Sequence, residues 1–363
     1  MQHTPDDADR ERDGTGGAFD LLDDGKPVVA FGEILLRLSP PGKQLLLQTP
    51  RLDVWVGGAE ANVATALARL GHATRLISAL PEGPLGDAGL AAVRANGVDT
   101  GSIRRGPGRM GLYWVETGAG LRPTEVLYDR AGSAFAAVPA QEWNFEESLA
   151  GAGLLHLSGI TPALGPNGAA AALAAARAAT GRGIPVAFDG NHRSRLWDSW
   201  NSDPRTVLAG LVGEADILFG NHRDIALLLD RDFPAGSKSG RADRDRAAAE
   251  AAFSAFPRLR IIASTARVVL APDRHRLTAR VDTPDTSVET EELVIDGIVD
   301  RIGTGDAFAA GFLHGLLSRQ SHAAAASTGL ALSALKHSVP GDMSPFDTRT
   351  LAAFTADADD VRR

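Results

Sequence analysis

The segment Asp-Arg-Ile-Gly-Thr-Gly-Asp at residues 300–306 places two glycines and a carboxylate at the predicted start of a helix. The first N–H groups of a helix have no intrahelical partner and carry the positive end of its dipole. Glycine lacks a Cβ, so its backbone can approach a phosphate oxygen closely. Residues 303–306, called the glycine turn below, therefore predict an anion site.

Asp306, the last residue of the glycine turn, has two interpretations. Phosphoryl transfer to a hydroxyl needs a proton acceptor beside the nucleophile, and a carboxylate next to an anion site can be that general base. Acidic residues also favour the starts of helices, so Asp306 could be an ordinary cap. The local pattern does not decide between base and cap.

A second pair of glycines, Gly57 and Gly58, opens a predicted helix over residues 59–70 that Gly71 closes. Asn62 lies one turn into this helix, where its amide could bind a ligand hydroxyl. The alternative is that the glycines only permit close helix packing.

Strand and helix patterns alternate through most of the chain. Residues 28–31 form a continuous apolar run, which is typical of a buried parallel strand. A β-like run over residues 291–299 leads into the glycine turn, and a helical pattern follows it. The alternation predicts a parallel sheet with helices on both faces. Further strands are predicted at 74–80, 154–158, 185–188, 216–219 and 260–264. Helices are predicted at 86–96, 168–180, 206–212 and 243–256, and one more opens after the segment 220–224 and ends at residue 229.

Polar side chains follow two of these strands. Asp189, Asn191 and Arg193 come directly after one strand, and Asn221 and Asp224 after the next. Ligands of such sheets lie off the carboxyl ends of the strands. Both clusters and the glycine turn are therefore expected at one edge.

Two segments, 39–56 and 108–130, have shorter polar and apolar alternation with Pro and Gly. The first could be a pair of strands outside the main sheet, and the second contains strands at 111–116 and 125–128. We expect a small sheet that forms a lid over the cleft.

Composition excludes several classes of protein. The net charge of −8, without a block of Lys or Arg, argues against a general nucleic-acid or membrane-surface binder. The absence of cysteine excludes disulfides, thiolate catalysis and Cys-ligated zinc. The histidines are scattered without a pair at ligand spacing, and Walker and dinucleotide-binding loops are missing. No apolar run is long enough to span a membrane and no hydrophobic signal core is present, so we expect a cytoplasmic protein.

The ends of the chain differ from its middle in composition. Residues 1–26 are rich in Asp, Arg and Gly, and we expect a disordered tail there. The folded domain is expected over residues 27–351, and residues 352–363 are expected to be a C-terminal tail.

The segments 57–64 and 300–308 together resemble the two signatures of the PfkB, or ribokinase-like, carbohydrate kinases. The match runs from about residue 28 to about residue 346. This resemblance implies a ribokinase-like three-layer α/β/α fold with a mostly parallel central sheet and a small β-sheet lid. It also implies ATP and Mg²⁺ as cofactors.

The resemblance assigns roles to both glycine segments. Asp306 would deprotonate the sugar hydroxyl. The backbone anion hole would come from Gly303, Thr304 and Gly305. Sugar hydroxyls would be held by Gly57, Gly58 and Asn62.

Further motifs are similar to those of the family's 2-keto-3-deoxygluconate kinases, whose substrate carries a carboxylate. These are Tyr113 in Gly-Leu-Tyr, the segment 128–134, and Asp-Gly-Asn-His-Arg at 189–193. Guanidinium groups suit a carboxylate, so Arg130 and Arg193 are the expected clamps, although each could instead be in a surface ion pair. The substrate side of the site is then predicted to include Tyr113, Tyr128, Arg130 and Arg193. The nucleotide side is predicted to include Asn191, Asn221, Asp224, Arg267, Lys336 and His337.

One departure from the family concerns magnesium. The family usually has Asn-x-x-Glu where this chain has Asn221 and Asp224. Asp224 keeps the charge but is shorter by a methylene, so an indirect contact with Mg²⁺ through water is expected.

Three alternatives stay open. The substrate could be another sugar, such as fructose, ribose or 2-keto-3-deoxygalactonate. The protein could be a sugar or nucleotide sensor without catalysis. The lid strands have edges that need covering, so the lid could also join copies of the chain into a homo-oligomer.

Overall fold

The computed structural model describes residues 22, 25–234 and 240–356. Within these residues the central sheet has ten strands, in the order β13-β12-β11-β10-β9-β8-β1-β4-β5, with β14 paired to β12. Neighbouring strands run parallel from β5 to β11 and antiparallel beyond β11. These strands are β1 (Val28–Phe31), β4 (Thr74–Pro81), β5 (Ile103–Gly106), β8 (Leu154–Ser158), β9 (Val186–Asp189), β10 (Ile217–Phe219), β11 (Ile261–Ala271), β12 (Arg274–Asp282), β13 (Ser287–Glu289) and β14 (Leu293–Ile295).

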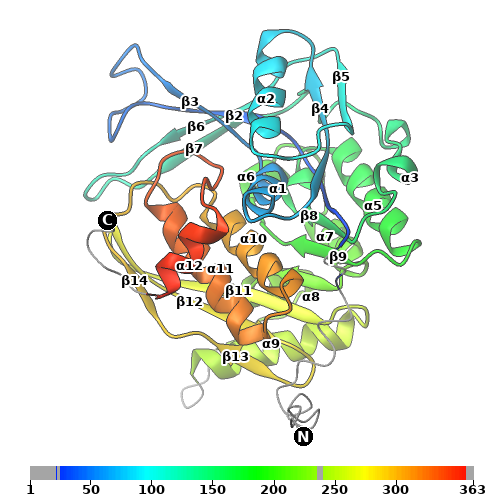
Figure 1. The fold of residues 1–363 in the computed structure, drawn as a ribbon, viewed down its shortest axis with the longest axis vertical. Coiled ribbons are helices and arrows are strands. Elements are labelled where there is room, and N and C mark those ends of the chain that lie inside the picture. The colour runs from blue at the N-terminus through cyan, green and yellow to red at the C-terminus, as the bar shows by residue number, and fades with distance from the viewer. Residues whose placement is uncertain (1–21, 23–24, 235–239, 357–363) are drawn as a thin grey trace, which may run out of the picture.

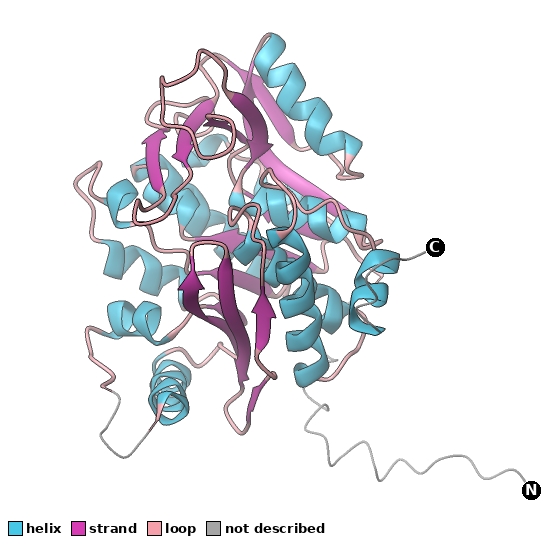
Figure 2. Cartoon of the chain, turned by 90° about the vertical axis from the view of Figure 1, so that its left-hand side faces the viewer, coloured by secondary structure: helices cyan, strands magenta, loops and turns pink. Residues whose placement is uncertain are grey.

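Helices cover both faces of the central sheet (Figure 2). Since successive side chains of a strand point to opposite faces, a strand that is buried on both faces is apolar throughout. In β1, Val29 and Phe31 belong to the hydrophobic cluster that includes buried residues of α5, α7, α8 and α9, whereas Val28 belongs to the cluster that includes residues of α1, α10 and α11. The helices are α1 (Ala59–Arg69), α2 (Pro84–Ala95), α3 (Phe145–Ser148), α4 (Ile160–Ala163), α5 (Pro166–Thr180), α6 (Ser194–Trp197), α7 (Pro204–Val212), α8 (His222–Leu229), α9 (Arg241–Ala255), α10 (Thr304–Leu317), α11 (His322–His337) and α12 (Thr348–Ala356), with a 3-10 turn at Ala140–Glu142.

A second, four-stranded sheet has the order β3-β2-β6-β7. Its strands, β2 (Leu35–Ser39), β3 (Asp53–Gly57), β6 (Gly111–Glu116) and β7 (Glu125–Asp129), lie together at the upper left of Figure 1. We call it the lid sheet. The predicted small sheet is therefore confirmed, but its first strand begins at Leu35. The stretch between β2 and β3, within the segment expected to hold a strand pair, is a loop with turns.

The chain before the glycine turn differs from the expectation. Only Leu293–Ile295 of the apolar run at 291–299 is a strand, and it pairs antiparallel with β12. Asp296 and Gly297, with Gly297 at φ 65°, interrupt the run. The strand predicted at 260–264 also continues to Ala271 and returns as β12, a hairpin that the sequence did not predict.

The ends of the domain also extend further than expected. Leu351 of helix α12 is buried in the cluster that includes α10 and α11. Helix α12 continues to Ala356, past the predicted boundary at residue 351. Leu22 is buried in the same cluster, although it lies in the expected N-terminal tail. Most of that tail lies outside the described residues.

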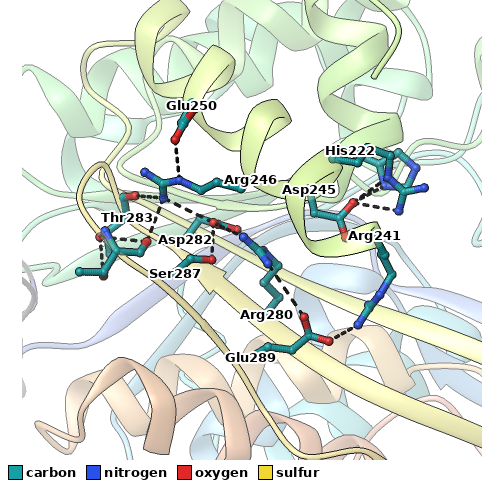
Figure 3. A network of polar contacts seen from close by, with 12 residues as sticks. His222, Arg241, Asp245, Arg246, Glu250, Arg280, Asp282, Thr283, Ser287 and Glu289 are labelled. Atoms are coloured by element: carbon teal, nitrogen blue, oxygen red, sulfur yellow. Dashed lines mark hydrogen bonds and ion pairs between the residues drawn. The ribbon is translucent and has the colours of Figure 1, made fainter. Parts of the chain in front are cut away.

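Polar contacts connect helix α9 to the outer edge of the sheet (Figure 3). Its buried residues are all alanine. Arg246 donates hydrogen bonds to the carbonyl oxygens of Thr283 and Pro284 at 2.8 and 2.7 Å. Beside it, Arg280 forms a two-pronged ion pair with Asp282 at 2.7 and 2.8 Å. These contacts fix the outer antiparallel edge of the sheet.

Across the described ranges, no helix combines the length and the apolar character needed to cross a membrane.

Candidate active site

A cavity of about 680 Å³ lies where the lid sheet faces the carboxyl ends of β9 and β10, the middle of β11 and the first turns of α1 and α10. Both polar clusters predicted for this sheet edge contribute to its lining, together with the glycine turn. The predicted site residues that line it are Gly58, Asn62, Tyr113, Tyr128, Arg130, Asn191, Arg193, Asn221, Asp224, Arg267, Gly303, Thr304, Gly305 and Asp306.

The glycine turn has a backbone that only glycine suits at its first position. Gly303 is the N-cap of α10 with φ 76°, and a Cβ placed on it would lie 1.9 Å from the carbonyl oxygen of Asp342. No side chain caps the helix. The first N–H groups of α10 are therefore available to an anion in the cavity.

Asp306 is the third residue of α10, so it is not the N-cap. Its Oδ2 accepts a hydrogen bond of 2.7 Å from Nδ2 of Asn62 on α1. Burial raises the pKa of Asp306 to about 7, against the opposing effect of the Asn62 hydrogen bond. A carboxyl group that titrates near neutrality, beside an anion site, has the properties of a general base.

Two further carboxyl groups face the cavity. Burial and the nearby Asp306 carboxylate raise the pKa of Asp189, at the end of β9, to about 8. Burial also raises the pKa of Asp224. Asp224 and Asn221 form a capping box on α8, in which Asp224 accepts the Asn221 N–H at 2.8 Å. Sequence reasoning placed Asp189 at this edge but did not choose it as a site residue.

The two predicted clamp arginines differ in their surroundings. Arg130 is 6% exposed, and its Nε donates to Oε2 of Glu33 at 2.7 Å. Arg193 is exposed, its Nη1 donates to the carbonyl oxygen of His192, and no carboxylate of the described residues lies within 4 Å of its guanidinium. Arg193 is therefore free to bind an anion, whereas Glu33 already holds one edge of Arg130.

Glu33 was not predicted, although Gly32-Glu33 directly follows the first strand. Besides Arg130, Glu33 accepts a hydrogen bond from the Ser133 hydroxyl. A Cβ on Gly111 would lie 2.4 Å from a Glu33 oxygen, which explains the glycine at the start of β6. The sequence signal that could have identified Glu33 was the position of a carboxylate at the carboxyl end of a buried strand.

Two more arginines line the cavity. They are Arg267 on β11 and Arg301, just before the glycine turn. Burial and repulsion from Arg301 lower the pKa of Arg267. Two guanidinium groups that repel each other beside the free N–H groups of α10 favour an anionic ligand with several charges. The sequence prediction included Arg267 but not Arg301.

Three predicted site residues do not line the cavity. Gly57 packs against Asp342, since a Cβ on it would lie 2.2 Å from Oδ2 of that residue. Lys336 is fully buried and donates to the carbonyl oxygen of Val339 at 3.2 Å. His337 is buried too, with its Nδ1 at 2.7 Å from the carbonyl oxygen of Ser333. The side chains of Lys336 and His337 thus support the site from inside the protein.

Asp342 is a residue of the cavity lining that sequence reasoning missed. Its Oδ2 accepts a hydrogen bond from the Tyr113 hydroxyl, and its Oδ1 lies 3.1 Å from Nε of Arg37. Burial raises the pKa of Asp342 to about 6, opposed by Arg37. Asp342 therefore joins the lid sheet to the segment that follows α11.

No group of three or more metal-ligating side chains is found among the described residues. A divalent cation in this cavity would have to share its ligands between one or two carboxylates, water and a bound anion. Mg²⁺ is commonly held in this way.

Comparisons with known proteins agree with this geometry. The model of the pfkB family carbohydrate kinases matches residues 26–349. A 2-dehydro-3-deoxygalactonokinase of Haloferax volcanii is 33% identical over 317 residues, which are 87% of this chain and 92% of that protein. The crystal structure of a 2-dehydro-3-deoxygluconokinase from Thermotoga maritima superposes with a TM-score of 0.84 at 33% identity, and covers 92% of this chain and 100% of the other.

A more distant structure shares the fold. A fructokinase from Xylella fastidiosa with bound ATP has a TM-score of 0.72 at 22% identity, over 91% of this chain and 98% of that one.

Proposed function

The chain belongs to the pfkB family of carbohydrate kinases, and on that premise we propose that it transfers the γ-phosphoryl group of ATP to 2-keto-3-deoxygluconate. The product is 2-keto-3-deoxy-6-phosphogluconate. The observation that carries the proposal is the position of Asp306, at the uncapped N-terminus of α10 and in one cavity with the free guanidinium of Arg193.

The arrangement supports a direct displacement. Asp306 accepts the proton of the sugar hydroxyl while the oxygen of that hydroxyl bonds to the γ-phosphorus. At the same time the bond from the γ-phosphorus to the oxygen of the β-phosphate breaks. The N–H groups of the glycine turn bind the negative charge of the transferred group. The lid sheet covers the cavity and excludes water, so that the phosphoryl group goes to the sugar.

A carboxylate-bearing sugar fits the substrate side of the cavity. The Arg193 guanidinium has no carboxylate within 4 Å in the described part of the chain, and Arg130 is oriented by Glu33. Guanidinium groups bind carboxylates with two parallel hydrogen bonds, which hydroxyl groups cannot match. Tyr128, Gly58 and Asn62 then remain as partners for sugar hydroxyls.

Nucleotide and metal fit the opposite side. Arg267, Arg301 and the glycine turn suit a triphosphate, and Asn191 and Asn221 border it in the proposed complex. The Asp224 carboxylate raises the free energy of the charged form of Asp189, an effect that a nearby Mg²⁺ would relieve. The metal would neutralise phosphate charge.

The galactonate epimer is a second candidate substrate. The relative from Haloferax volcanii is named as a kinase of this epimer and is 33% identical to this chain. The 2-dehydro-3-deoxygluconokinase from Thermotoga maritima has the same identity. The two sugars differ at one carbon, and the clamp on the carboxylate serves both.

We also propose that copies of the chain associate through the lid sheet. Tyr113 and Tyr128 face the cavity, so the alternate residues Trp114 and Leu127 face outwards. Leu127 is 50% exposed and Val54 57%, and both belong to a row of paired apolar residues across the sheet. Light scattering is expected to show a dimer or larger form, and Leu127→Lys is expected to weaken it. A wild-type monomer at micromolar concentration contradicts this part.

The test of the function is ADP release from Mg²⁺-ATP with a panel of sugars and sugar acids. We expect turnover with 2-keto-3-deoxygluconate that Asp306→Asn lowers by about 10²- to 10⁴-fold. Equal activity on fructose or ribose would contradict the carboxylate clamp. A panel without any turnover would favour a sensor.

A further inference from the structure

Arg37 is a buried cation that the reaction does not use directly. It lies on strand β2 of the lid sheet, is 3% exposed and does not line the cavity. Its Nη2 donates to Oδ2 of Asp300 at 2.6 Å, and its Nε lies 3.1 Å from Oδ1 of Asp342. One guanidinium group of the lid therefore contacts two aspartates of the kinase body.

Both aspartates contact the backbone at the start of the glycine turn. Asp300 accepts the N–H of Ile302 at 3.0 Å and the N–H of Gly341 at 3.1 Å. Asp342 packs its carbonyl oxygen against Gly303 so closely that no Cβ fits. A displacement of Arg37 would thus move two aspartates that contact Ile302 and Gly303, at the start of the turn proposed to bind the transferred phosphoryl group.

The same contacts reach the sugar side. Asp342 accepts the hydroxyl hydrogen bond of Tyr113, and both residues line the cavity. A second link starts at Arg301, the residue after Asp300, which donates to the Thr124 hydroxyl, just before strand β7, at 3.2 Å. Asp300 and Arg301, adjacent in sequence, therefore contact two different strands or loops of the lid.

We propose that Arg37 is a positioning residue that couples the lid to the glycine turn, so that binding of the sugar acid and binding of the nucleotide strengthen each other. The inference rests on the proposed function. A buried guanidinium is suited to this role, because it donates a hydrogen bond to Asp300 and forms an ion pair with Asp342 at the same time, and its loss removes the cation that lies between two mutually repelling carboxylates.

The experiment measures the affinity for a non-hydrolysable ATP analogue with and without saturating 2-keto-3-deoxygluconate. Wild type is expected to bind the analogue at least about 10-fold more tightly with the sugar acid present, within the usual range of coupling between sites. Arg37→Met is expected to reduce this factor to about 2-fold or less, with a smaller effect on either affinity alone.

Two variants control the experiment. Arg37→Lys keeps the charge but reaches one carboxylate at a time, so it is expected to fold and to show a reduced coupling factor even if Arg37→Met does not fold. Arg51→Met removes a lid arginine that is 69% exposed and lies 3.8 Å from Asp53, and it is expected to keep wild-type coupling. Wild-type coupling in a folded Arg37→Lys or Arg37→Met protein overturns the inference.

A second readout separates this inference from the choice of sugar. The ATP analogue alone is expected to slow amide hydrogen exchange in residues 35–57 of wild type and of Arg51→Met, but not of Arg37→Met or Arg37→Lys. Slowing in all four proteins, or in none, overturns the coupling role. Failure of 2-keto-3-deoxygluconate to bind wild type, with this pattern of exchange intact, counts against the proposed substrate alone.

Discussion

Asn62 donates its side-chain N–H to the carboxylate of Asp306 at 2.7 Å, and so joins the first turns of helices α1 and α10 inside the cavity. This hydrogen bond favours the charged form of Asp306, while burial disfavours it. The two opposing effects leave the pKa of the proposed base at about 7.

Removal of this hydrogen bond should move the pH profile. In Asn62→Ala the carboxylate of Asp306 loses a donor, so its pKa rises, by about 1 unit for a hydrogen bond of ordinary strength to a charged group. The acidic limb of kcat/KM should shift to higher pH by that amount. The pH dependence of the rate is the measurement, with Asn167→Ala, an exposed amide outside the cavity lining, as the control. An unshifted limb would mean that Asp306 is not the group that titrates.

Asp306→Asn should stabilise the protein while it removes activity. The pKa of Asp306 is raised from 3.8 to about 7, so the folded state binds more protons than the unfolded state between these values. The stability of wild type therefore falls as pH rises through this window, whereas Asp306→Asn, whose amide does not ionise, has no such decrease. The melting temperature of the variant relative to wild type should increase between pH 4 and pH 8. Turnover should fall by about 10²- to 10⁴-fold. A constant difference in melting temperature contradicts the burial of this charge.

Arg193 and Arg130 should give different effects when replaced by alanine. Arg193→Ala should raise KM for the sugar acid by about 10-fold or more and leave KM for ATP unchanged, because a charge-assisted contact is lost. Arg130→Ala leaves Glu33 buried without its ion-pair partner, so it should destabilise the fold by about 3 kcal/mol or more. Kinetics and thermal unfolding together distinguish the two. A loss of stability in Arg193→Ala, without a change in KM, would place that residue in a structural ion pair.

The two glycines of the glycine turn should differ in their tolerance of alanine. Gly303→Ala forces a Cβ against the carbonyl oxygen of Asp342 at a φ of 76°, and should cost about 2 kcal/mol or more of stability. Gly305 has nothing within 4 Å of a Cβ, so Gly305→Ala should keep or slightly raise the melting temperature. Thermal unfolding of both variants checks this. Equal losses would show that the turn is not restrained by Asp342.

Asp224 should set the magnesium requirement. Asp224→Ala removes one of the two carboxylates proposed to face the metal, and should raise the Mg²⁺ concentration for half-maximal activity by about 10-fold. It also removes a contact of the capping box, so Asp203→Ala, which removes the N-cap of α7 outside the cavity lining, is the matched control. Asp203→Ala should lower stability by about 1 kcal/mol without any change in the magnesium titration. Identical titrations for both variants would exclude Asp224 from the metal site.

Local patterns predicted the parts of the site that lie on continuous motifs. The glycine turn, the start of α1 and the polar clusters after β9 and β10 each have a spacing that is visible in the chain. The rule that ligands lie at the carboxyl ends of parallel strands was then enough to bring them together.

Residues whose roles arise from packing could not be predicted in this way. Arg37 sits in an alternating strand pattern, and nothing beside it indicates that its partners lie more than 200 residues away. Asp342 lies in the same segment as Lys336 and His337, and nothing in that segment indicates that its carboxylate, rather than their side chains, lines the cavity. Lys336 and His337 are polar residues near the end of a helix, and only the packing of α11 shows that their side chains point into the protein. Such roles depend on which elements meet in space.

The hydrogen bond from Asn62 to Asp306 spans 244 residues, and the ion pair from Arg37 to Asp300 spans 263. During synthesis, strand β2 and helix α1 leave the ribosome long before the glycine turn exists. A nascent chain can therefore form most of its parallel sheet without the proposed base or anion site. Activity begins only when the last quarter of the chain closes onto the first, so unfinished or truncated chains have no means to consume ATP.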